Sequence, residues 1–401
     1  MTLTQKYFGY VRISTNASGH LAYQPARLLS YFAERRDNVG MVIKNIQALR
    51  AIAANLVLIS HLFIVEQKYS HYGSVLPADA HFGAFGVDLF FVISGFIMAM
   101  IARNVSWQRF LIDRAARIFP PYWFYTTVIL IVSLCAPAYV NSTFEHQPSL
   151  WRSYLLIPDS VGPLLAVGWT LIHEMYFYYC FTAMIFLTRL FTIKITALLL
   201  IWMTAVICLN ALAHLYELGD PVVAVITHPL TLEFIFGVAI GVLSNKNVAA
   251  FAMSALFAGA IIFAIDLSLF GDVLSSVDDR NWRRAILVGM PCASIVYGLV
   301  GIEVRSKLTA PHWLVVLGNA SYSIYLSHVL VLSAIGRGFA MIPDHNVYSE
   351  TAFVIICIGA ANIVGLVSYS LIERRRHGQR RGRRKDGRAL GRLGSEISSA
   401  P

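Results

Sequence analysis

Charged side chains are scarce in this sequence of 401 residues: only 13% are Asp, Glu, Lys or Arg, while 57% are hydrophobic. A soluble domain usually carries about 25% charged residues. This shortage argues against an ordinary soluble domain. The positive mean hydropathy points the same way, so we expect an all-α polytopic membrane protein.

Paired cysteines and the common catalytic motifs are also absent. The five cysteines all fall in apolar segments without paired spacing, which excludes a disulfide framework and a cysteine zinc site. The sequence has no G-x-S-x-G elbow for a serine nucleophile, and no P-loop or dinucleotide fingerprint. We therefore expect no metal, and any chemistry must come from polar residues inside the membrane.

The net charge of +10 comes largely from the run between Arg374 and Arg392. We interpret this run as a solvated cytoplasmic tail rather than a nucleic-acid site. The N-terminal residues are polar without a long apolar run, so they are not a cleavable signal peptide. The expected organisation is a cytoplasmic leader at 1–43, a membrane domain at 44–373 and a basic tail at 374–401.

Apolar segments long enough to span a bilayer recur about ten times in the membrane domain. Most lysines and arginines fall in alternate connections and in the two terminal segments, so both termini are predicted to be cytoplasmic. The predicted spans are 47–66, 84–102, 118–138, 167–188, 195–213, 222–243, 248–270, 285–302, 313–335 and 350–372.

The stretch 44–63 places an arginine and a histidine on one face of an apolar helix. At about 100° per residue, the path from Arg50 to His61 returns to within about 20° of its starting direction and advances about 16 Å. This is about half of a hydrocarbon core. An ionisable side chain near the midplane costs roughly 2.5 kcal/mol or more unless it faces protein or water. We therefore interpret His61 as a functional residue.

The second span and the connection after it carry further candidates. Asp88 lies in FGVDLFFVISGF and should face the bundle, while Gly86 and Gly95 in the same segment suit close helix packing. Arg114 and Arg117, three positions apart, share a helical face just inside the membrane. Such a pair suits a phosphate-bearing ligand. The local pattern alone favours an anchor to anionic lipid over a phosphate site, and both interpretations stay open.

Two later spans carry polar side chains on one face. Glu174 and Tyr178 lie four residues apart in the fourth span, so a buried, hydrogen-bonded carboxylate is expected there. Ser321, Tyr325 and His328 form a stripe along the ninth span. That stripe fits helix-to-helix hydrogen bonding as well as a substrate groove.

Five segments in this order resemble the acyltransferase-3 family of integral membrane acyltransferases. They are Arg50-x10-His61, GVDLFFVISGF, Arg114-x-x-Arg117 before IFPPYW, WTLIHEMYFY and LGNASYSIYLSH. The first segment, NIQALRAIAANLVLISH, is most similar to the exopolysaccharide-production branch. The resemblance covers about residues 45–373, nearly all of the chain except the leader and the tail.

The resemblance implies a ten-span protein of the bacterial inner membrane that moves an acyl group, usually acetyl from acetyl-CoA, to a carbohydrate hydroxyl. Its implied partners are acyl-CoA, membrane lipids and a sugar polymer or lipid-linked oligosaccharide. Family members often have two adjacent glutamates where this chain has His173 and Glu174, so Glu174 keeps the second acid. Essential roles are implied for four basic positions that this chain matches: Arg50, His61, Arg114 and Arg117.

Acyl transfer from a thioester to an alcohol requires a base, and the near-neutral histidine His61 suits that role. It would either deprotonate the sugar hydroxyl directly or carry the acyl group as a relay. The three arginines would hold the phosphates of CoA. Either Asp88 or Glu174 would orient the imidazole or balance its charge, and Tyr325 and His328 would line the acceptor path.

A proton-coupled transporter or flippase for a lipid-linked glycan or a small molecule is the alternative from another class. Ten spans with intramembrane His, Asp and Glu suit such a carrier equally well. A purely structural scaffold would not explain why Arg50, His61 and Glu174 occur in membrane-spanning segments. The paired arginines favour the CoA-dependent enzyme, because a carrier does not need them.

Overall fold

The computed structural model describes residues 43–102, 105–137, 147–243, 251–274, 282–306, 308–343 and 345–374. The expected leader and basic tail lie outside this part of the chain, apart from one residue each. Every regular element within it is helical, which confirms the all-α prediction. In chain order the elements are α2 (Lys44–Tyr69), η2 (Ala78–Phe85), α3 (Gly86–Ala102), α4 (Trp107–Cys135), α5 (Leu150–Leu155), α6 (Gly168–Leu190), α7 (Ile195–Leu215), α8 (Pro221–Ile226), α9 (Leu230–Leu243), α10 (Ala252–Leu274), α11 (Trp282–Arg284), η4 (Ala285–Gly289), α12 (Met290–Ser306), α13 (His312–Asn319), α14 (Ser321–Phe339), α15 (Val347–Ser368) and η5 (Tyr369–Arg374).

Eight helices in the described residues are long and apolar enough to cross a membrane, and one bent pair would make a ninth. The predicted span 167–188 corresponds to α6, which has 23 residues but is not among the eight. Its low hydropathy follows from His173, Glu174 and three tyrosines in its first half.

The predicted span 313–335 is not one continuous helix. It is divided into α13 and α14, which meet at an angle of 70°. The reason is tertiary: α13 lies so close to the start of α2 that a Cβ on Gly318 would sit 1.9 Å from the Gln47 carbonyl oxygen. Packing against α2 therefore sets the direction of α13 separately from that of α14.

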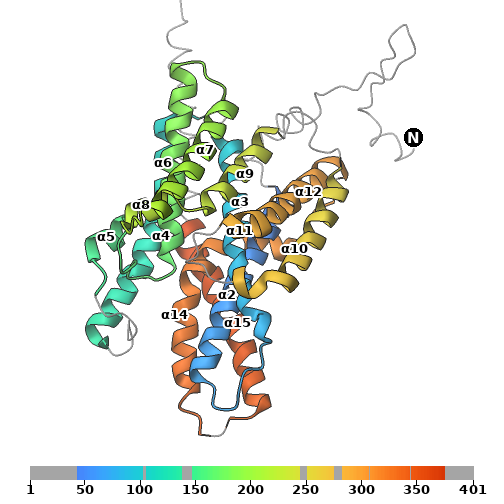
Figure 1. Cartoon of the computed structure of the whole chain (residues 1–401). Helices are drawn as coiled ribbons and strands as arrows, with labels where there is room; N and C mark the ends of the chain where they lie inside the picture. Colours follow the sequence, from blue (N-terminus) through green and yellow to red (C-terminus); the bar gives the residue numbers. More distant parts are fainter. Residues whose placement is uncertain are drawn as a thin grey trace, which may run out of the picture.

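Helix α2 packs against η2, α3, α12, α13, α14 and α15. Figure 1 shows it beside α14 and α15 in the lower part of the molecule. The most extensive helix pair joins α3 to α9. Glycines make this approach possible, because a Cβ on Gly95 would lie 2.0 Å from the Phe234 carbonyl oxygen and one on Gly237 would lie 1.9 Å from that of Val92. The close packing predicted for Gly95 is confirmed.

Gly95→Ala should lower the stability of the bundle by about 1–3 kcal/mol, because the added methyl group forces two packed backbones apart. Thermal unfolding of the detergent-purified protein measures this effect. Gly359→Ala is the matched control: Gly359 also lies within a helix, and no described atom stands within 4 Å of the Cβ it would gain. An unchanged melting temperature for Gly95→Ala would contradict the packing of α3 on α9.

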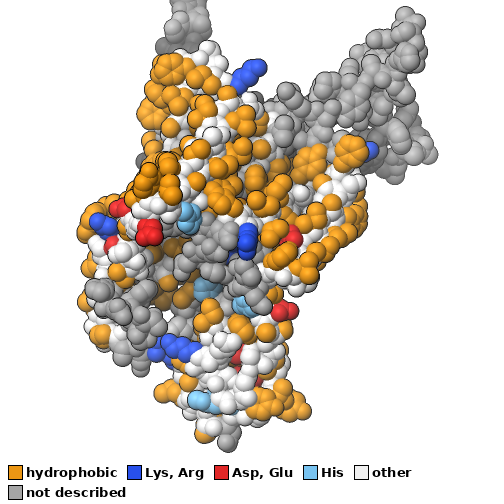
Figure 2. Space-filling model, viewed as in Figure 1, with side chains coloured by type: hydrophobic (Ala, Val, Ile, Leu, Met, Phe, Trp, Pro, Cys, Tyr) orange, Lys and Arg blue, Asp and Glu red, His pale blue; other side chains and the backbone are white. Residues whose placement is uncertain are grey.

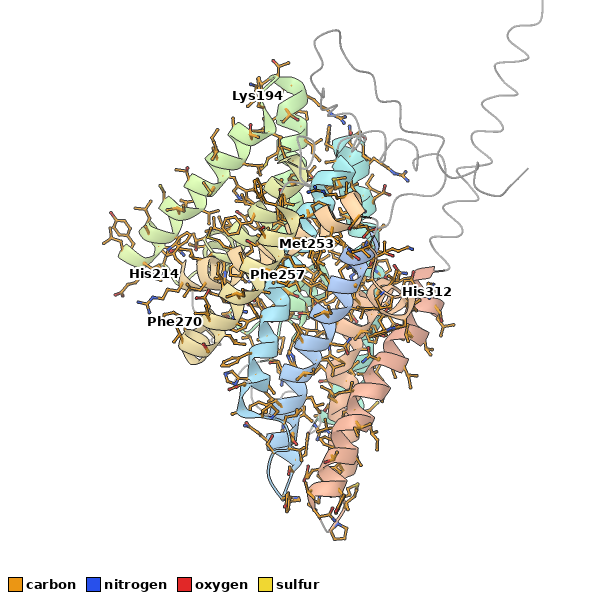
Figure 3. The ribbon with its side chains drawn as sticks, turned by 90° about the vertical axis from the view of Figure 1, so that its right-hand side faces the viewer. Lys194, His214, Met253, Phe257, Phe270 and His312 are labelled. Carbon is orange, nitrogen blue, oxygen red and sulfur yellow. The ribbon has the colours of Figure 1, made fainter. Side chains whose placement is uncertain are left out.

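On the face of the bundle shown in Figure 2, exposed apolar side chains gather mainly over the upper part. Met253, Phe257 and Phe270 are exposed along α10, and Lys194 and His214 mark the two ends of α7 (Figure 3). With 21 residues, α7 is about 31 Å long, which matches the hydrocarbon thickness of a bilayer. Apolar faces of this length and exposure fit a multi-pass membrane protein.

Candidate active site

A pocket inside the bundle is lined by side chains from α2, α3, α4, α6 and α14. Its empty space amounts to about 730 Å³, including the part that is open to the outside. Apolar and aromatic side chains form most of its wall. Five of the residues proposed from the sequence meet there: Arg50, Arg114, Arg117, Glu174 and Tyr325.

The arginines reach the pocket from two helices. Ser106 caps the N-terminus of α4, because its side chain accepts a hydrogen bond from the backbone N–H of Arg109. The first three turns of the helix contain Arg114 and Arg117. Because these two are three residues apart, both point to the same side of α4. Arg50 comes from the second turn of α2 and is buried. The sequence prediction of a paired face on α4 is therefore confirmed.

Positive charge is in excess in this pocket. Three arginines and one glutamate line it, and none of the three guanidinium groups has a carboxylate within salt-bridge distance among the described residues. Arg50 donates only one side-chain hydrogen bond there, from Nη1 to Gln47 Oε1 at 3.2 Å. The buried Nε of Arg114 has no partner in the described chain. Buried cations with free donors favour an anionic ligand.

Glu174 is held by two hydroxyl groups. Its Oε1 accepts hydrogen bonds from Ser94 Oγ at 3.1 Å and from the hydroxyl of Tyr178, one turn along α6. The predicted contact between Glu174 and Tyr178 is confirmed. The neighbouring His173 points elsewhere and packs against His228, with 4.9 Å between the ring centroids. His173 does not line the pocket.

Tyr325 connects the arginine pocket with His61. The Tyr325 hydroxyl lies 2.7 Å from Thr170 Oγ1 and donates to the Val167 carbonyl oxygen at 3.1 Å. Its ring centroid is 5.8 Å from that of His328, which in turn lies 4.9 Å from that of His61. His61 and His328 do not line the arginine pocket; His328 packs against Tyr325, and His61 packs against His328.

The tautomer of His61 follows from its hydrogen bond. Nδ1 lies 2.9 Å from the Val57 carbonyl oxygen, one turn back on α2. A carbonyl oxygen only accepts, so Nδ1 carries the proton and Nε2 presents its lone pair. A backbone carbonyl group, rather than the carboxylate of Asp88 or Glu174, forms the hydrogen bond with this imidazole.

Asp88 is placed away from the arginine pocket. It is fully buried, and its two oxygens accept hydrogen bonds from Arg284 Nε at 2.8 Å and Nη2 at 2.6 Å. Buried Glu233 lies beside this pair. The expectation that Asp88 faces the bundle is confirmed, and among the described residues its carboxylate pairs with Arg284 rather than with His61. Sequence spacing could not reveal a partner 196 positions away.

Some lining residues were missed by the sequence analysis. Three of them are Ser94, Thr170 and Tyr322. They lie in segments that carry the family resemblance, but their spacing does not distinguish a pocket-lining hydroxyl from one that only joins helices. Tyr322 donates a hydrogen bond to the Ile118 carbonyl oxygen at 2.8 Å and so joins α14 to α4.

Comparison with known proteins identifies the family of this chain. A family model described as an acyltransferase domain matches residues 43–370. The chain is 31% identical over 322 residues to the exopolysaccharide production protein ExoZ of Rhizobium meliloti (strain 1021), covering 78% of this chain and 93% of that protein. No solved structure gives a significant match. With the family model spanning nearly all of the membrane domain, the chain belongs to the acyltransferase-3 family of membrane acyltransferases.

Proposed function

We propose that this acyltransferase moves an acetyl group from acetyl-CoA to a hydroxyl group of an exopolysaccharide sugar. The acceptor is a sugar polymer or a lipid-linked oligosaccharide, and the enzyme works in the bacterial inner membrane. The name of the relative, an exopolysaccharide production protein, supports the acceptor class. Acetyl is the group that the resemblance implies.

One observation carries the proposal: three guanidinium groups without carboxylate partners converge in a pocket of the described bundle. Phosphate groups form bidentate, charge-assisted hydrogen bonds with arginine. CoA presents several phosphates at one end and its thioester at the end of a long, flexible arm. With the phosphates on Arg50, Arg114 and Arg117, the arm would extend past Tyr325 toward His61.

His61 supplies the base in this proposal. Its Nε2 lone pair takes the proton of the acceptor hydroxyl while the sugar oxygen attacks the thioester carbonyl carbon. Because Nδ1 is held by the Val57 carbonyl, the ring keeps its orientation as Nε2 becomes protonated. Glu174, fixed by Ser94 and Tyr178, would balance part of the positive charge of the arginines. Direct transfer is the form we propose, with an acyl-histidine relay as the other route.

The test is transfer of label from radiolabelled acetyl-CoA to the surface-glycan fraction, in membranes with and without the protein. Label that moves only with the protein supports the acyltransferase proposal for this donor and acceptor class. No transfer above that of empty membranes would reject acetyl-CoA as donor. Transport of glycan that stops when the proton gradient is dissipated would favour the carrier instead.

We also propose ten spans, with α6 as one of them and with both termini in the cytoplasm. This orientation puts Arg50, Arg114 and Arg117 near the cytoplasmic surface, where CoA is made. A reporter that works only in the cytoplasm should therefore be active when it is fused after Lys385. A reporter that works only in the periplasm should be inactive at the same position. Activity of a periplasmic reporter at the same position would overturn the topology and the side assigned to the donor together.

A further inference from the structure

His328 is a completely buried histidine at the centre of the bundle. Neither ring nitrogen makes a hydrogen bond of normal geometry among the described residues, although the carbonyl groups of Ile324 and Tyr325 on its own helix lie close to the ring. A buried polar group without a partner costs about 1–3 kcal/mol. Such a group is retained where a ligand or a reacting group completes its hydrogen bonds.

The neighbours of His328 indicate which group would complete its hydrogen bonds. Its ring meets that of His61 edge to face, with centroids 4.9 Å apart and planes at 74°. Its ring centroid also lies 5.8 Å from that of Tyr325, which lines the arginine pocket. A thioester arm that passes Tyr325 to reach the Nε2 atom of His61 therefore arrives beside His328.

The two histidines have different hydrogen-bond states. His61 has its proton fixed on Nδ1 by the Val57 carbonyl and offers a lone pair. No hydrogen bond of normal geometry in the described chain fixes the tautomer of His328, so either ring nitrogen can carry the proton and act as a donor. Two imidazolium ions this close would repel each other, so His328 should stay neutral while His61 is protonated during the reaction.

We propose that His328 is a catalytic residue that donates an N–H hydrogen bond to the acyl carbonyl oxygen during transfer; this inference rests on the proposed function. As the sugar oxygen bonds to the carbonyl carbon, its proton moves to His61 Nε2 and the carbonyl π electrons move to oxygen. His328 stabilises that oxyanion. When the tetrahedral intermediate collapses, the C–S bond breaks, and His61 returns the proton to the departing CoA thiolate.

Two substitutions separate a hydrogen-bond donor from a base. His328→Gln keeps an N–H donor but has no basic nitrogen, whereas His328→Leu removes the donor and keeps an apolar side chain in the bundle. We expect the leucine variant to lower the maximal rate about 10²- to 10³-fold, as for the loss of an oxyanion donor. The glutamine variant should stay within about tenfold of the wild type. The acetyl-CoA concentration for half-maximal rate should change little in both, since His328 does not line the arginine pocket.

The assay is the initial rate of label transfer from acetyl-CoA to the surface-glycan fraction, together with acetyl-CoA binding to each purified variant. Normal binding shows that a variant is folded, and His328→Met replaces the leucine variant if that one does not bind. A glutamine variant as inactive as the leucine variant would overturn the donor role, as would a fully active leucine variant. A wild type that does not transfer label would instead reject the proposed function, and this inference with it.

Discussion

His61→Ala should lower acetyl transfer to the level of empty membranes, a loss of about 10²- to 10⁴-fold, because the acceptor hydroxyl then has no base. The protein should remain inserted and abundant, since the imidazole makes one side-chain hydrogen bond, to the Val57 carbonyl. Binding of acetyl-CoA should be almost unchanged, because His61 lies outside the arginine pocket. The measurement combines label transfer with binding of labelled acetyl-CoA.

His214→Ala is the matched control for this result. His214 lies near the end of α7, is exposed and does not line the arginine pocket. Its substitution should leave both transfer and binding at the wild-type level. Transfer that persists in His61→Ala would remove His61 from the mechanism, whatever the variant's affinity for the donor.

The double substitution Arg114→Ala and Arg117→Ala should weaken acetyl-CoA binding by at least about 100-fold. Each lost charge-assisted hydrogen bond is worth about 1.5–3 kcal/mol, and a tenfold change in Kd corresponds to about 1.4 kcal/mol. The substitution removes two of the three cations of the pocket and leaves the helix intact, because alanine favours helix formation. Equilibrium binding of labelled acetyl-CoA to the purified protein measures the change.

Arg109→Ala provides a control that also removes an arginine from α4. Arg109 lies on the same helix, but its side chain is exposed and paired with Asp113 at 2.9 Å. Exposed ion pairs contribute about 0–1 kcal/mol, so affinity should stay close to that of the wild type. If the double variant binds as tightly as Arg109→Ala, then Arg114 and Arg117 are better explained as an anchor to anionic lipid.

Much of the candidate site is encoded locally in the sequence. The helical period alone places Arg114 beside Arg117 and Glu174 beside Tyr178, and the structure contains both arrangements. These pairs are predictable because their members belong to one helix, whose geometry fixes their relative directions. The role of each residue in catalysis stays a prediction until the substitutions are tested.

Contacts between helices could not be read in the same way. The partner of Asp88 is Arg284, and sequence reasoning placed that arginine in a connecting segment. The pairing arises because α3 packs against α9 and η4, which brings distant parts of the chain to Asp88. Likewise the break between α13 and α14 depends on the close approach of Gly318 to α2.

By itself, the sequence determined the helical class, the membrane setting and the basic and acidic residues available for chemistry. Hydrophobicity and helical period are properties of a segment, so they need no tertiary information. Only the tertiary structure decided that Arg50 joins Arg114 and Arg117 in one pocket, and that His328 packs against both Tyr325 and His61. Those neighbours come from different helices, and packing of the whole bundle is what sets the distances between them.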